Sequence, residues 1–251
     1  MLRSTLLLIL GIAIQLTTFS QCIDSTKIKW GGDYGFINYI RQCPTYNFAY
    51  GGDTSKHWNV LDDAIDIMQA PIKVIELKHK VDAAIKNYAG KNFYSDVRFN
   101  SVEVVYPDKL KTFTDSGRGG LTLKYCKAKY FFYYTFQPDR IGKGYLIGVA
   151  VDKYGKIISP FTFPSKNDYK PIDKTYTYCK LIDIARSTQK NINPIDEISL
   201  NYDKKNKRFY WFISQAIVDT HEGINYINVV TIDAANLSRA KTYKSHAMII
   251  Y

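Results

Sequence analysis

The feature that most constrains the fold is a change of hydrophobic period that occurs twice along the chain. Before Gly90 apolar residues recur at helical spacing, and after it they alternate with polar residues, as in a half-buried sheet. The first helical stripe is closed by Gly90 as a C-terminal cap and consists of Val74, Leu77, Val81, Ala84, Ile85 and Tyr88. A second stripe again precedes alternating segments and consists of Leu181, Ile184, Ala185 and Thr188. The sequence therefore predicts an α+β fold of two units, each with a helix packed on an antiparallel sheet.

Each unit is expected to contain four strands. In the first unit these are 97–104, with a bulge near Asn100, then 121–136, 145–151 and 156–159. In the second unit they are 198–202, 208–218, 224–233 and 239–243. Residues 129–136 match 207–213 in pattern, and residues 148–152 match 229–233, which predicts an internal repeat. A further short helix, ending before Pro71, is predicted from the spacing of Trp58, Leu61, Ala64, Ile65 and Met68.

The N-terminus has the pattern of a secretory signal peptide over residues 1–20. Arg3 precedes the apolar run Leu6–Ile14, and small polar residues lead to a cleavage site before Gln21. No later stretch approaches the roughly 20 apolar residues of a membrane helix, so no transmembrane segment is expected. We therefore expect a secreted, periplasmic or cell-envelope protein. Its parts would be the signal peptide, an irregular disulfide-tethered extension (21–56), the first unit (57–160), a proline-rich linker (161–174) and the second unit (175–251).

Four cysteines follow the expected cleavage site: Cys22, Cys43, Cys126 and Cys179. In an oxidising compartment they are expected to pair, and three connectivities are possible. We favour Cys22 with Cys43, which are neighbours in the extension, and Cys126 with Cys179. A lipid anchor at Cys22 is an alternative, although Gln21 is not the small residue that normally precedes a lipidated cysteine. Because no C-x-x-C pair occurs and the histidines are dispersed, no zinc site or other cofactor is expected.

The chain is basic, with a formal net charge of +11. Such a charge favours anionic surfaces, and binding to a polyanion or an envelope surface is one functional alternative. The basic residues are spread through strands and turns, for example over 204–208, instead of lying on one recognition helix. No nucleic-acid partner is therefore expected, and a solvated lysine-rich surface explains the composition.

The second unit resembles a PepSY-type domain, a secreted module in which a helix lies across an antiparallel sheet as in cystatins. The resemblance covers roughly residues 178–244, is weaker over 72–160, and rests on the stretches 182–186, 208–213 and 230–234. Where the family has a glycine-containing turn, this chain has Ala235-Asn236-Leu237, and asparagine tolerates the same left-handed backbone. The resemblance implies a non-catalytic module that regulates proteases or binds proteins, and it implies no catalytic residues.

The sequence shows no local signature of catalysis. The histidines at 57, 79, 221 and 246 lie near no Gly-x-Ser-x-Gly turn and are expected at the surface. The carboxylates Asp62, Asp63, Asp66, Asp196 and Glu197 suit helix starts and turns. The glycine-rich segment 117–120 lacks the Lys-Ser/Thr sequel of a phosphate loop. No catalytic or metal-binding residue is assigned.

The most distinctive stretch is the aromatic run 130–136. Alternation places one set of side chains on one face of a strand, namely Tyr130, Phe132, Tyr134 and Phe136, and places Phe131 and Tyr133 on the other. One face serves the helix, and the other is either covered by the extension or the second unit, or is used for binding. The first set is the predicted binding surface, for a protein or peptide added as a strand at a free sheet edge. A small-ligand carrier or enzyme with an aromatic-lined pocket between helix and sheet is the alternative.

Overall fold

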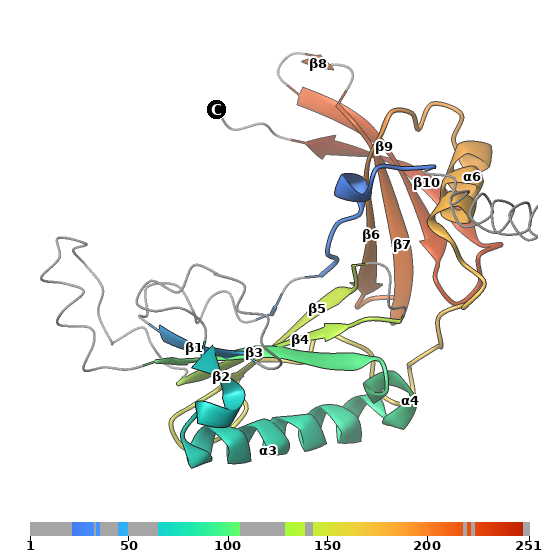
Figure 1. Cartoon of the computed structure of the whole chain (residues 1–251). Helices are drawn as coiled ribbons and strands as arrows, with labels where there is room; N and C mark the ends of the chain where they lie inside the picture. The colour runs from blue at the N-terminus through green and yellow to red at the C-terminus, as the bar shows by residue number, and fades with distance from the viewer. Residues whose placement is uncertain are drawn as a thin grey trace, which may run out of the picture.

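The computed structural model describes residues 22–32, 34–35, 45–49, 65–105, 129–138, 143–217, 220–221 and 224–247. The predicted signal peptide, most of the predicted helix before Pro71 and the first half of the predicted strand 121–136 lie outside these residues. Within the described residues the fold is α+β, with helices packed on two largely antiparallel sheets (Figure 1). In this part of the chain, no helix is long and apolar enough to cross a membrane.

The first sheet has the strand order β2-β1-β3-β4-β5. Its strands are β1 (Thr45–Ala49), β2 (Ile65–Asp66), β3 (Val97–Val105), β4 (Tyr130–Phe136) and β5 (Tyr145–Val151). The pairing is antiparallel except between β1 and β2, which run parallel. The predicted bulge is confirmed, because the register of β3 on β4 shifts between Phe99 and Ser101.

One face of the first sheet is covered by helix α3 (Ile72–Ala89), as Figure 1 shows. The helix buries Val74, Leu77, Val81, Ile85 and Ala89, which is nearly the predicted stripe. Gly90 ends it with a φ of 84°, a left-handed conformation that glycine adopts without strain. The short helix α4 (Lys91–Tyr94), which the sequence did not predict, follows and turns Phe93 into the core.

The second sheet has the order β10-β9-β7-β6, with β8 paired to β9. Its strands are β6 (Ile195–Asp203), β7 (Arg208–Gln215), β8 (Thr220–His221), β9 (Ile224–Asp233) and β10 (Ala240–Ala247). Helix α6 (Tyr178–Thr188) packs on one face through Leu181, Ile182 and Ala185. The hydroxyl of Thr177 accepts a hydrogen bond from the Lys180 N–H at 3.1 Å and caps the helix start.

The two sheets share one core. Phe93 stacks on Phe136 of β4 and on Phe163 at centroid distances of 4.4 and 5.4 Å, and Phe136 stacks on Phe209 of β7 at 5.1 Å. Phe163 lies in the predicted linker but is only 1% exposed and belongs to this core. The connection is therefore packed between the units, although their boundaries and the internal repeat stay predictions.

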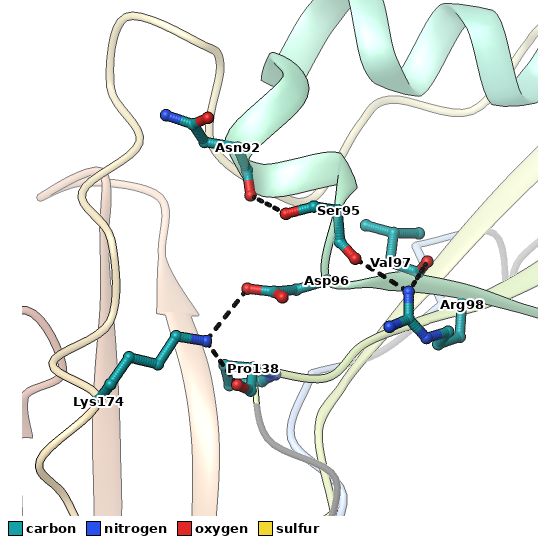
Figure 2. Close-up of polar contacts among 7 residues, drawn as sticks. All are labelled: Asn92, Ser95, Asp96, Val97, Arg98, Pro138 and Lys174. Carbon is teal, nitrogen blue, oxygen red and sulfur yellow. Dashed lines mark hydrogen bonds and ion pairs between the residues drawn. The ribbon is translucent and has the colours of Figure 1, made fainter.

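A lysine of this connection also contacts the first unit. Figure 2 shows the Lys174 Nζ atom between the Asp96 carboxylate, 3.4 Å away, and the Pro138 carbonyl, 2.5 Å away. Asp96 directly precedes β3 and Pro138 follows β4, so one side chain reaches the ends of two neighbouring strands. Nearby, the Arg98 guanidinium donates to the Ser95 and Val97 carbonyls. Because the Lys174 side chain is 60% exposed, its ion pair mainly fixes position and adds little stability.

Residues 22–32, here called the N-terminal strap, join the outer edges of both sheets. Ile28 forms a parallel bridge with Ile198 of β6, and Gly31 forms one with Tyr145 of β5. Cys22 is bonded to Cys179 at the start of α6. The expectation of a Cys22–Cys43 pair is therefore wrong, and so is its companion Cys126–Cys179. Neither Cys43 nor Cys126 lies within the described residues.

Cys22 and Cys179 lie far apart in sequence, and proximity along the chain was the reason for the wrong pairing. The strap instead carries Cys22 across the edge of β6 to α6, so the fold decides the partner. A sulfur bonded to Cys179 cannot also carry a lipid, which removes the alternative of an anchor at Cys22.

Two predicted secondary-structure elements differ from those observed. Residues 65–69 form β2 and a 3-10 turn in place of a helix end, and 156–159 contribute only a bridge at Ile157.

Candidate functional site

The predicted binding surface on β4 is part of the core. Tyr130, Phe132, Tyr134 and Phe136 are 5, 0, 1 and 0% exposed. These four side chains pack against the apolar stripe of α3. The alternation in the sequence predicts that one face of this strand packs on the helix, and this is that face. The prediction that these four side chains form a recognition surface is therefore wrong, because helix and sheet bury them against each other.

The opposite face of β4 is covered as well. Phe131 and Tyr133 form a second buried cluster, and the ring of Tyr34 meets that of Tyr133 edge-on at 4.7 Å. Burial, with a further contribution from the Glu103 carboxylate, raises the pKa of Tyr133 well above its usual value. Tyr34 belongs to the N-terminal extension, so cover by this extension is confirmed at that residue.

Polar side chains from α3 and β4 contact each other between the helix and the first sheet. The Tyr134 hydroxyl donates to the Asp82 carboxylate at 2.8 Å, and Lys78 pairs with the same carboxylate at 2.8 Å. Burial and Asp82 raise the pKa of Tyr134. The polar groups that a pocket here would offer to a ligand are thus engaged with each other, which argues against the alternative of a carrier site between helix and sheet.

The face of the second sheet turned away from α6 carries partly exposed aromatic and basic side chains. Alternation directs Trp211 and Ile213 of β7 toward α6 and leaves Tyr210 and Phe212 on the other face. The strand register brings Phe212 opposite Thr231 of β9, and Thr231 opposite Lys241 of β10. On β6, Asn201 lies opposite Tyr210, so neighbouring side chains from four strands form one surface.

This surface is hollowed into a groove of about 290 Å³, here called the outer groove. Its lining includes Asn201, Tyr210, Phe212, Thr231, Lys241 and Tyr243. The rings of Phe212 and Tyr243 are 6.3 Å apart, and Tyr243 is 44% exposed. A second cavity of about 480 Å³ adjoins it beyond β6 and shares Asn201 and Asp203 with it. Half-buried aromatic rings beside polar groups are typical of recognition surfaces.

The acidic groups beside the outer groove are occupied by the protein itself. Asp233, 3% exposed, pairs with the Arg208 guanidinium at 2.8 Å and accepts the Ala235 N–H. Burial opposes ionisation of Asp203, but hydrogen bonds from Asn206 and Lys205 outweigh it and lower its pKa. Partial burial raises the pKa of Tyr210 and of Tyr243, so both hydroxyls stay neutral donors. Asp203 lines the β6 side of the groove as an ionised carboxylate, and Lys241 supplies the positive charge on the β10 side.

The outer groove ends at an open sheet edge. The strap occupies part of the edges of β5 and β6, where Leu146 donates to the Gly31 carbonyl and Lys29 donates to the Ile198 carbonyl. By contrast, β10 is the last strand of its sheet and pairs only with β9 among the described residues. An edge of this kind offers unpaired backbone groups to a further strand.

The register identifies these backbone groups. The Asp233 N–H donates to the Arg239 carbonyl at 2.9 Å, and antiparallel pairing alternates between residues that bond inward and residues that bond outward. Arg239, Lys241 and Tyr243 therefore bond to β9. The N–H and C=O groups of Thr242 and Lys244 point away from the sheet, in position to pair with an added strand.

The remaining candidates from the sequence do not converge. His79 is exposed on α3, as predicted, whereas His57 and the segment 117–120 lie outside the described residues. Asp66 caps a 3-10 turn by accepting the Met68 N–H, and Asp196 pairs with Lys27 at 3.1 Å. Among the side chains that the structure describes, no group of three or more His, Cys, Asp or Glu residues is arranged to hold a metal ion.

Sequence reasoning did not find the outer groove. The alternating pattern of 208–213 and 239–243 could have indicated the groove, because it separates Phe212 and Tyr243 from the helix-facing residues. The binding surface was predicted on β4 instead, because its aromatic run is denser. Comparison with known proteins adds no functional assignment: no family model, no curated protein and no solved structure matches the chain.

Proposed function

We propose that this protein is a secreted, non-catalytic binding protein that captures an extended segment of a protein or peptide along the open edge of β10. The open edge is the observation that carries the proposal. An added strand would bond to the outward backbone groups of Thr242 and Lys244, and every second side chain would lie beside Tyr243 at the outer groove.

Two features support a secreted binding role. The disulfide between Cys22 and Cys179 suits an oxidising compartment, in agreement with the signal-like N-terminus. The likeness of residues 178–244 to PepSY-type modules points to the same class of proteins. Because main-chain bonds are common to all sequences, strand addition supplies affinity, and the groove supplies selectivity.

The test uses a displayed library of random peptides, selected against the whole protein, and a proline substitution at Thr242. Thr242→Pro removes an N–H that points outward and leaves the bonds between β9 and β10 in place, so the fold is expected to persist. Thr242→Val keeps this N–H and is the matched control. We expect the selected peptides to bind the wild type and Thr242→Val alike, and to bind Thr242→Pro at least about tenfold more weakly, as expected for loss of about one intermolecular hydrogen bond.

Thermal unfolding of the three proteins shows whether the substitutions preserve the fold. Undiminished binding to a folded Thr242→Pro variant, or a library that yields no binding peptide, would overturn the proposal. If Thr242→Pro unfolds, hydrogen exchange of the wild type tests strand addition instead. We then expect peptide binding to slow exchange at the Thr242 and Lys244 amides. Unchanged exchange at both amides would equally refute strand addition.

A further inference from the structure

We infer that the segment captured at β10 is acidic, an inference that rests on the proposed function and names its partner class. The strand and its approach carry Arg239, Lys241 and Lys244, all exposed, and no acidic residue occurs between 238 and 247. The residues opposite the two lysines on β9 are the neutral Thr231 and Asn228. Within the described part of the chain, neither lysine has an ion-pair partner.

The two lysines cover both faces of an added strand. Lys241 lines the outer groove, whereas Lys244 lies on the opposite face of the sheet together with Thr242. The Thr242 hydroxyl on that face accepts a hydrogen bond from the Gln189 side chain, which follows α6. An extended peptide beside β10 presents alternate side chains to these two faces. Carboxylates at neighbouring positions of the peptide would therefore each meet a cation, whichever face they point to.

A second copy of the chain is a poor occupant of this edge. Pairing of β10 with β10 would bring lysines of one strand close to lysines of the other, and like charges directly across a strand pair destabilise it. The same lysines attract a partner of opposite charge, and the net charge of +11 on the chain adds long-range attraction. The charge pattern thus disfavours self-association and favours an acidic partner.

The two aromatic rings of the outer groove add a preference for apolar side chains in the captured peptide. The Phe212 and Tyr243 rings lie beside Lys241 in the groove. Residues two positions apart in an extended peptide share one face, so an apolar side chain can contact the rings while a carboxylate two positions away contacts Lys241. A peptide that combines acidic and aliphatic residues in an extended conformation fits this arrangement. A uniformly charged polyanion leaves the rings unused.

The experiment measures the affinity of two synthetic peptides for the whole protein by fluorescence anisotropy. One combines glutamate and valine so that both occur on each face of the extended strand, and the other has glutamine at each glutamate position. We expect the glutamate peptide to bind about tenfold more tightly at low salt, as several exposed charge pairs of moderate strength would give. This ratio is expected to shrink at high salt because exposed pairs are screened.

Two charge-reversal variants locate the effect. Lys241→Glu combined with Lys244→Glu is expected to abolish or invert the preference for the glutamate peptide. Lys204→Glu combined with Lys205→Glu makes the same change of net charge on the turn between β6 and β7 and is expected to keep the preference. If both double variants lose it equally, the attraction comes from net charge alone and the inference is wrong.

The outcomes separate this inference from the proposed function. If both peptides bind equally and Thr242→Pro weakens both, strand capture stands and the acidic preference is refuted. If the glutamate peptide is preferred but Thr242→Pro binds it as well as the wild type does, the basic surface is real and strand addition is refuted. Failure of the glutamate peptide to bind at all overturns the inference, while the library selection still decides the function.

Discussion

Tyr169 packs against Phe93 and Phe136 at the joint between the two sheets, with ring centroids 5.2 and 6.2 Å away. Burial, reinforced by the Asp96 carboxylate, raises its pKa from 10.0 to about 12. The folded protein therefore holds the hydroxyl proton more tightly than the unfolded chain does. Tyr169 therefore links the shared core to the response of the protein to alkaline pH.

The sign of the pH dependence follows from the raised pKa. The contribution of Tyr169 to stability is complete below the ordinary pKa near 10 and is lost as pH rises toward 12, because the unfolded chain ionises first. Tyr169→Phe should therefore flatten the fall of the unfolding free energy over this range, measured by urea denaturation at successive pH values. Tyr154→Phe, at a site 80% exposed, is the control. Equal slopes in the wild type and Tyr169→Phe would contradict the assignment.

Among the elements, the N-terminal strap depends on close approach to β6. A Cβ atom added at Gly31 would lie 1.5 Å from the Leu200 carbonyl oxygen, a distance that no rotamer relieves. Glycine is thus required where the strap passes between the edges of β5 and β6. The bonds of Gly31 to Gly144 and Leu146 depend on the same approach.

Gly31→Ala should push the strap off both edges. We expect faster hydrogen exchange at the Lys29 and Leu146 amides and a loss of about 1–3 kcal/mol in unfolding free energy, the usual range for overpacking. Lys29→Ala changes an exposed neighbouring side chain and should leave both quantities nearly unchanged. Wild-type protection of the two amides in Gly31→Ala would show that the strap does not need the glycine.

The sequence predicts elements whose pattern is local. The stripe in 74–88 predicts α3, and alternation predicts β3 with its bulge, because helix and strand periods depend on neighbouring residues only. The bridge of Ile28 to Ile198 and the bond of Cys22 to Cys179 join residues far apart in the chain, so no local pattern encodes them. A last strand was expected over 239–243, and the structure has β10 over Ala240–Ala247. Its position at the edge, which makes it a candidate site, follows only from the sheet order.

For the molecule as a whole, the decisive feature is that both sheets bury residues in one aromatic core. Phe209 of β7 stacks on Phe136 of β4 at 5.1 Å and meets the Tyr145 ring of β5 at 5.3 Å. Contacts of this kind couple the two units energetically. We therefore expect the described part of the chain to unfold as one cooperative body.

Phe209→Ala tests this coupling. The substitution should lower the unfolding free energy by about 3–5 kcal/mol, as for other buried phenylalanines, and should lower it equally for both sheets. Hydrogen exchange near global unfolding, read at β4 and at β9, gives the two values separately. Phe212→Ala, on the half-buried outer face of the same strand, should cost less. A first sheet that keeps its wild-type stability in Phe209→Ala would show that the units unfold independently.

The bond between Cys22 and Cys179, 157 positions apart, also determines how the molecule bears mechanical load. A force applied to the chain on either side of this bond passes through the sulfur atoms, so the residues between them carry no tension while the bond is intact. The strap, α3 and the first sheet all lie inside this shielded loop, and the load falls on the strands after Cys179. Reduction of the bond would extend the load path to the whole chain and lengthen it by the entire loop.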